Sequence, residues 1–86
     1  LGMLIARMPK YRLNYGDQFE FFAQTAGDVV PVLQERRMVG GSDDERFFLR
    51  RVAIEMCEWN GKNYYYHSRS ALADSMIKNG LLEVID

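Results

Sequence analysis

Residues 42 to 61 constrain the fold most, because they have the pattern of one amphipathic helix with a signal at each end. The apolar residues of this segment recur at helical spacings and are Phe48, Leu49, Val52, Ala53, Met56, Cys57 and Trp59. At about 100° per residue they cover one side of a helix. Ser42, with Glu45 three residues later, has the form of a capping box, and Asn60-Gly61 supplies a left-handed helix end. The pattern therefore predicts a helix over about 43–60.

A β-hairpin is the alternative for the end of this segment. Asn-Gly is also the strongest two-residue hairpin turn, so residues 52–59 have a second option, as a strand paired with residues 62–68. Polar and apolar residues alternate poorly across 47–59, however, since neither face would be consistently polar. The helix is therefore favoured over the hairpin.

The other elements are shorter. A second helix is predicted over 69–79, capped by Ser68 or Ser70 and ended by Gly80. Four segments are predicted as strands, namely 10–15, 18–24, 63–68 and 81–85. The segment 28–38 is compatible with a short helix that carries Pro31 in its first turn, or with an edge strand. The predicted fold class is α+β, with a small antiparallel or mixed sheet of three to five strands and two helices packed on one side.

Length and composition indicate a single compact domain over residues 1–86. The chain is 48% hydrophobic, 27% charged and has a net charge of −1, so no long-range attraction to DNA or to an anionic membrane is expected. Cys57 is the only cysteine, which excludes an internal disulfide and fits a reducing cytoplasm. We expect no metal, cofactor or membrane span. Leu1-Gly2 before Met3 has the look of a cloning remnant.

One cluster contains the residue types of a catalytic triad. His67 is followed by Ser68 and Ser70, and Asp74 lies one helical turn further on. Serines at the start of a helix are explained by capping alone, and neighbouring sequence positions do not give the geometry that a nucleophile and its base require. Cys57 is expected on the apolar face of its helix, where burial would raise a thiol pKa. The sequence therefore predicts no catalytic residue and no enzyme.

A nucleic-acid-binding surface is the second interpretation. Tyrosines lie beside cations in the segment 62–69, and the candidate residues are Lys62, Tyr64, Tyr66 and Arg69. Aromatic rings flanked by cations on a sheet are how many single-strand binders stack bases. If residues 62–68 form a strand, Tyr64 and Tyr66 share a face with Lys62. Only one face would be free, because the other must cover the core.

A protein-binding surface is the first interpretation. Phe47 and Ile54 fall on the polar side of the first helix, beside Arg50 and Arg51. An apolar pair rimmed by charge is typical of a contact patch, unless the sheet wraps around the helix and buries it. The sequence therefore predicts a small interaction module that binds and modulates another protein or a second copy of itself.

The stretch "GKNYYYHSRSALAD", residues 61–74, resembles a turn-strand-helix segment of the small phage-encoded inhibitors of uracil-DNA glycosylase. The resemblance covers about a dozen of the 86 residues and assigns no functional residue. We carry no function over from it. Separately, a short chain without catalytic residues suits an accessory protein of a phage or mobile element that modulates a larger target.

Overall fold

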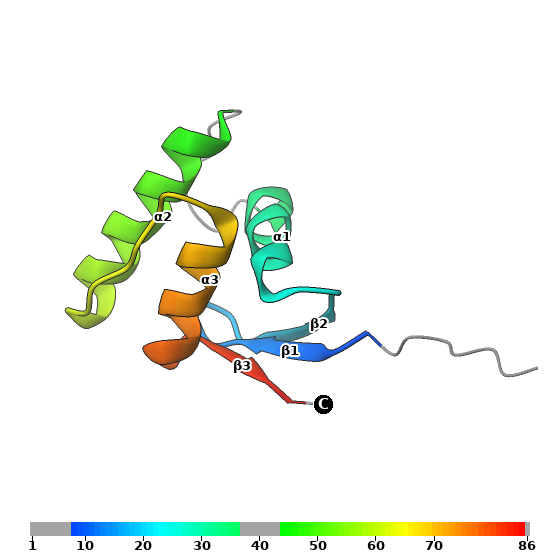
Figure 1. The fold of residues 1–86 in the computed structure, drawn as a ribbon. Coiled ribbons are helices and arrows are strands. Elements are labelled where there is room, and N and C mark those ends of the chain that lie inside the picture. Colours follow the sequence, from blue (N-terminus) through cyan, green and yellow to red (C-terminus); the bar gives the residue numbers. More distant parts are fainter. Residues whose placement is uncertain (1–7, 37–43, 86) are drawn as a thin grey trace, which may run out of the picture.

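The computed structural model describes residues 8–36 and 44–85 of the chain. Three antiparallel strands form one sheet, and three α-helices pack together on one side of it (Figure 1). This arrangement confirms the predicted α+β class. The third helix is an addition to the two that the sequence predicted.

The sheet has the strand order β2-β1-β3, so the first strand in the chain lies in the middle. β1 (Lys10–Leu13) and β2 (Phe19–Phe22) form a hairpin around Gly16, whose φ of 70° suits a glycine. β3 (Leu82–Val84) returns from the end of the described chain to pair with the other edge of β1. Alternation along β1 buries Tyr11 and Leu13 against the helices, whereas Lys10 and Arg12 are directed to the outer face.

α1 (Val29–Arg36) decides the ambiguous segment in favour of a helix. A short 3-10 turn, Ala26–Asp28, leads into it, and the Asp28 carboxylate accepts a hydrogen bond from the backbone N–H of Thr25 at 3.3 Å. Pro31 lies in the first turn, where its missing N–H costs no helical hydrogen bond. Val29, Val30 and Leu33 are fully buried, so packing selects the helix over an edge strand.

α2 (Glu45–Asn60) is the predicted first helix, and the hairpin alternative is wrong. Gly61 ends α2 in the left-handed conformation, and its N–H donates to the Cys57 carbonyl at 2.7 Å. The N-terminal cap differs from the predicted capping box, because the Asp44 side chain accepts from the Arg46 N–H at 2.9 Å. Ser42 lies outside the described residues.

α3 (Arg69–Lys78) begins as predicted, with Ser68 accepting a hydrogen bond from the Ala71 N–H at 3.0 Å. The strand predicted over 63–68 is wrong. Residues 61–68, here called the connector, run back along α2 to the start of α3 (Figure 1). Their backbone is held by helix side chains: the Tyr65 N–H donates to Ser75 Oγ at 3.0 Å, and the Asn63 carbonyl accepts from Asn79 Nδ2 at 2.8 Å.

The core lies between the helices and the inner face of the sheet. The side chains that are completely buried include Leu13, Leu33, Phe48, Val52, Met56, Leu72, Met76 and Leu82. Two predicted members of the α2 apolar side are exposed, which corrects the prediction. Cys57 lies at the margin of that side. Trp59 lies on the last turn of α2, and its ring packs edge-on against the ring of Tyr15, with 5.2 Å between the ring centroids. Within residues 8–36 and 44–85, no helix combines the length and apolar character needed to cross a bilayer.

Candidate functional site

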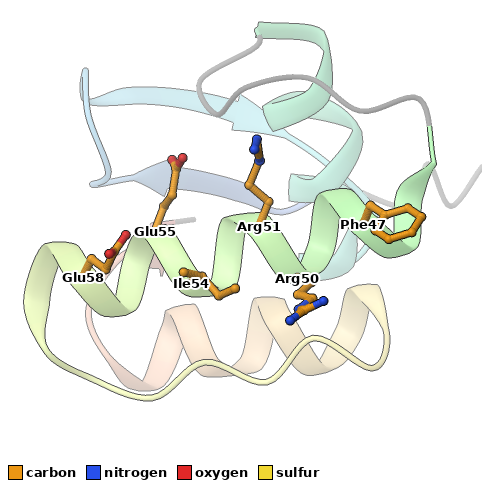
Figure 2. Close-up of a pocket in the computed structure, with 6 residues that line it drawn as sticks. All are labelled: Phe47, Arg50, Arg51, Ile54, Glu55 and Glu58. Carbon is orange, nitrogen blue, oxygen red and sulfur yellow. The ribbon is translucent and has the colours of Figure 1, made fainter.

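The four residues predicted to bind a protein lie together on the outer side of α2. Phe47, Arg50, Arg51 and Ile54, with Glu55 and Glu58, line one shallow depression, and these six residues are called the α2 stripe (Figure 2). Phe47 is 62% exposed and Ile54 is 47% exposed. The sheet therefore does not wrap around α2 to bury them, and the alternative considered from the sequence is wrong.

The charged residues of the α2 stripe are not neutralised within the described part of the chain. Arg50, Arg51 and Glu58 take part in none of its ion pairs. Glu55 interacts instead with the Tyr15 hydroxyl, and burial of Tyr15 together with this carboxylate raises the Tyr15 pKa. Among residues 8–36 and 44–85, the stripe thus presents, around its apolar residues, two arginines and one carboxylate that have no ion pair.

The connector extends this surface on one side. Tyr65 and Tyr66 are exposed and line a second depression together with Ile54 and Glu58 of the stripe. Tyr66 also shares a third depression with Phe47 and Arg50. The α2 stripe together with Tyr65 and Tyr66 is therefore one continuous surface, here called the α2 face. The sequence missed Tyr65 as a contributor because a strand would have directed it away from Tyr66.

Tyr64 fastens the connector and is not part of the α2 face. Its ring is 7% exposed, and its hydroxyl accepts a hydrogen bond from Asn60 Nδ2 at 2.6 Å. Burial raises the Tyr64 pKa against the opposing effect of this hydrogen bond. The prediction that Tyr64 stacks on a base is wrong, because the core already covers its ring.

Arg69 is also occupied within the chain. Its guanidinium forms a two-point ion pair with the Glu45 carboxylate, with Nε at 2.9 Å from Oε2. The hydrogen bonds from Arg69 hold the pKa of Glu45 below its usual value. This pair ties the first turn of α3 to the first turn of α2. Of the four residues predicted to bind nucleic acid, Lys62 and Tyr66 are exposed without such an engagement in the described chain.

The residue types of a triad line one depression without forming a triad. His67, Ser68, Ser70 and Asp74 surround it, together with Lys78. No hydrogen bond joins the His67 side chain to either serine or to Asp74 within the described residues, and Ser68 caps α3. Across residues 8–36 and 44–85, no three His, Cys, Asp or Glu side chains are grouped to hold a metal ion.

The outer face of the sheet provides a contrasting surface. Arg12 contacts Glu20 at 3.2 Å on one neighbouring strand and Glu83 at 3.4 Å on the other. Lys10 contacts Glu20 at 3.0 Å and lies 5.5 Å from the ring centroid of Phe22. Hydrogen bonds from Lys10 and Arg12 lower the pKa of Glu20. This face has the same residue types as the α2 face, but each of its charges has a partner.

Comparison of the chain with protein-family models, with curated proteins and with solved structures gives no match.

Proposed function

We propose that this chain is a small non-catalytic interaction module that binds a partner protein through the α2 face and modulates it. One observation carries the proposal: Phe47 and Ile54 are exposed side by side with Arg50 and Arg51, which have no ion pair in the described chain. Apolar side chains and arginine are enriched at the centre of protein interfaces. Tyr65 and Tyr66 add two rings, which supply contact area with few rotatable bonds.

The stability of the fold does not require this surface. The α2 residues that hold the core, Phe48, Val52 and Met56, lie on the opposite side of the helix. Substitutions of Phe47, Arg50, Arg51 and Ile54 are therefore expected to change binding while leaving the free energy of unfolding within about 0.5 kcal/mol of the wild-type value.

The test uses a photo-reactive amino acid at position 54 to cross-link the partner, and the same amino acid at position 77 as the control. Ile77 is an exposed isoleucine on α3, outside the α2 face. A protein captured only from position 54 is then purified, and its affinity is measured by calorimetry for the wild type, Ile54→Glu and Ile77→Glu. We expect Ile54→Glu to weaken binding at least about tenfold, which corresponds to about 1.4 kcal/mol.

The proposal fails if both isoleucine variants bind the captured protein as tightly as the wild type does. Phe47→Glu and Phe22→Glu form a second matched pair, because Phe22 is similarly exposed on the outer face of the sheet. We expect Phe47→Glu to lose binding and Phe22→Glu to retain it.

A second candidate function is single-stranded nucleic-acid binding, and one observation favours it. Arg46 and Arg50 line the same depression as Tyr66 and His67, so cations and a ring meet at one end of the α2 face. Binding of this kind requires a steep loss of affinity with added salt and a dependence on Tyr66. Glu55 and Glu58 at the other end of α2 would repel a phosphate backbone, which is why protein binding is proposed first.

A further inference from the structure

The charges of the α2 stripe follow an order along the helix. Arg50 and Arg51 lie in its first half, Glu55 and Glu58 lie in its second half, and Ile54 separates the two groups. Figure 2 shows Arg51 and Glu55 extending to one side of α2 and Arg50 extending to the other. Because Arg50 and Glu58 are each four residues from Ile54, reversing the helix about Ile54 exchanges their positions.

This order is complementary to a reversed copy of itself. We propose that two copies of the chain associate through their α2 faces, with the two α2 helices antiparallel and the two Ile54 side chains meeting at the twofold axis. Arg50 of each copy then faces Glu58 of the other, and Arg51 lies near the same carboxylate. The proposal rests on the proposed function, since it names the occupant of the α2 face.

Twofold symmetry makes each favourable pair occur twice. In such an interface residue i contacts residue j and residue j contacts residue i, so one Arg50–Glu58 match supplies two ion pairs. A parallel arrangement would instead oppose Arg50 with Arg50 and Glu58 with Glu58, which costs free energy. The charge order therefore selects the antiparallel pairing.

Two further features fit a second copy of this chain. Phe47 lies seven residues before Ile54 and Gly61 lies seven residues after it, so the reversed helix brings Phe47 toward Gly61 of the second copy. Nothing in the described chain lies within 4 Å of a side chain built at Gly61, which leaves room for the ring. The net charge of −1 also gives little long-range repulsion between copies.

The expected dimer is weak. α2 has 16 residues and is thus about 24 Å long, so a single helix pair forms an interface at the small end of the observed range. We expect a dissociation constant between about 10 µM and about 1 mM at low salt. The association should weaken as added salt screens the four ion-pairing side chains.

The test is a charge exchange followed by sedimentation equilibrium over that concentration range. Arg50→Glu alone would place two carboxylates across the interface, and Glu58→Arg alone would place two arginines there. Each single variant is expected to weaken dimerisation at least about tenfold. The double variant Arg50→Glu/Glu58→Arg restores both pairs in its homodimer. An equimolar mixture of the two single variants restores both pairs in the heterodimer.

Matched controls change the net charge equally at sites outside the α2 face. Lys78→Glu and Asp74→Arg are exposed changes on α3 and are expected to leave dimerisation as in the wild type. Far-ultraviolet circular dichroism and the thermal midpoint of each variant report whether it is folded. The double variant and the mixture keep the test decisive even where a single variant is less stable.

Three results would overturn the pairing. A wild type that stays monomeric up to about 1 mM excludes the dimer. The proposed function is then decided by the cross-linking experiment at position 54. A dimer that both single variants form normally, but that Ile54→Glu abolishes, rejects the antiparallel register and upholds the α2 face as the interface. A dimer unaffected by all of these changes lies elsewhere on the chain, and it rejects this inference.

Discussion

The outer face of the sheet and the α2 face are built from the same kinds of residue, yet they differ in how these residues are paired. On the sheet, Arg12 bridges two carboxylates and Lys10 lies by the ring of Phe22. On α2, Arg50 and Arg51 stand beside exposed Phe47 without an ion pair in the described chain. An exposed ring or arginine is therefore weak evidence of binding by itself. The two faces differ because Arg50 and Arg51 have no ion pair among the described residues, whereas Lys10 and Arg12 do.

The geometry of each element explains this difference. In a sheet, residues opposite each other on neighbouring strands lie close together, and the register places Arg12 opposite both Glu20 and Glu83. On a helix, Arg51 and Glu55 are four apart in the weaker basic-first order, and Glu55 is engaged with Tyr15. The charges of the outer sheet face are paired with each other, whereas Arg50, Arg51 and Glu58 of the α2 face have no ion pair among the described residues.

The largest expected effect is at Tyr64, which fastens the connector beside the α2 face. Replacing Tyr64 with alanine removes a buried ring, so we expect the free energy of unfolding to fall by about 3–5 kcal/mol. Urea denaturation followed by circular dichroism measures this change. Tyr64→Phe keeps the ring and loses the hydroxyl with its hydrogen bond from Asn60, at about 1 kcal/mol. Equal losses in the two variants would contradict the burial of the ring.

The next effect is at Ser75, a buried serine that accepts from the Tyr65 N–H and donates to the Ala71 carbonyl. Ser75→Ala leaves the Tyr65 N–H without its acceptor and is expected to cost about 1–3 kcal/mol. In this variant, the rate of amide hydrogen exchange is expected to rise more at Tyr65 than at the amides of β1. Ser70→Ala, at an exposed site on the same helix, is the control and should stay within about 0.5 kcal/mol.

A matched pair of arginines tests the comparison of the two faces directly. Arg12→Ala removes two ion pairs, so we expect a loss of about 0.5–1 kcal/mol and a rise of the Glu20 pKa toward its usual value. Arg51→Ala removes none in the described chain and should leave stability unchanged while weakening association. Denaturation and a carboxyl NMR titration give the two readouts. If Arg12→Ala and Arg51→Ala lower the free energy of unfolding equally, the two faces do not differ in how their charges are paired.

The smallest expected effect concerns the ion pair between Glu45 and Arg69. Its pairing lowers the folded-state pKa of Glu45 below 4.5, so the stabilisation is present above pH 4.5 and is lost as the pH falls through the lowered value. Glu45→Gln is expected to cost about 0.2–1 kcal/mol at pH 7. The difference between the variant and the wild type should disappear in acid. If the difference in the free energy of unfolding persists below the folded-state pKa of Glu45, the ion pair with Arg69 is not its cause.

Local signals in the sequence predicted α2, the strands β1 and β2, and the position of Phe47 outside the apolar side of α2. Each depends on neighbouring residues: the apolar side of α2 is regular, Gly61 ends it, and Phe47 falls outside that side. These features are set by helix and turn geometry, which short stretches of sequence encode. The proposed protein-binding residues were predicted in this way.

The connector was mispredicted because its partners are distant in sequence. Tyr64, Tyr65 and Tyr66 have high strand propensity, but propensity describes a half-buried surface and does not supply a neighbouring strand. Ser75 and Asn79, 10 and 16 residues from the groups that they bind, hold the connector instead. Likewise, burial of Val29 and Leu33 against the rest of the fold decided that α1 is a helix.

The central position of β1 has a consequence for the order of folding. Its hairpin with β2 closes over a few residues, but its contact with β3 joins Arg12 to Glu83, 71 positions apart. The entropy lost in closing so long a loop must be offset by contacts formed at the same time. The three helices offer those contacts, since they bury Leu13 and Leu82 in one core. We therefore expect β3 to dock late, after the helices have assembled, and mutations in β3 to speed unfolding more than they slow folding.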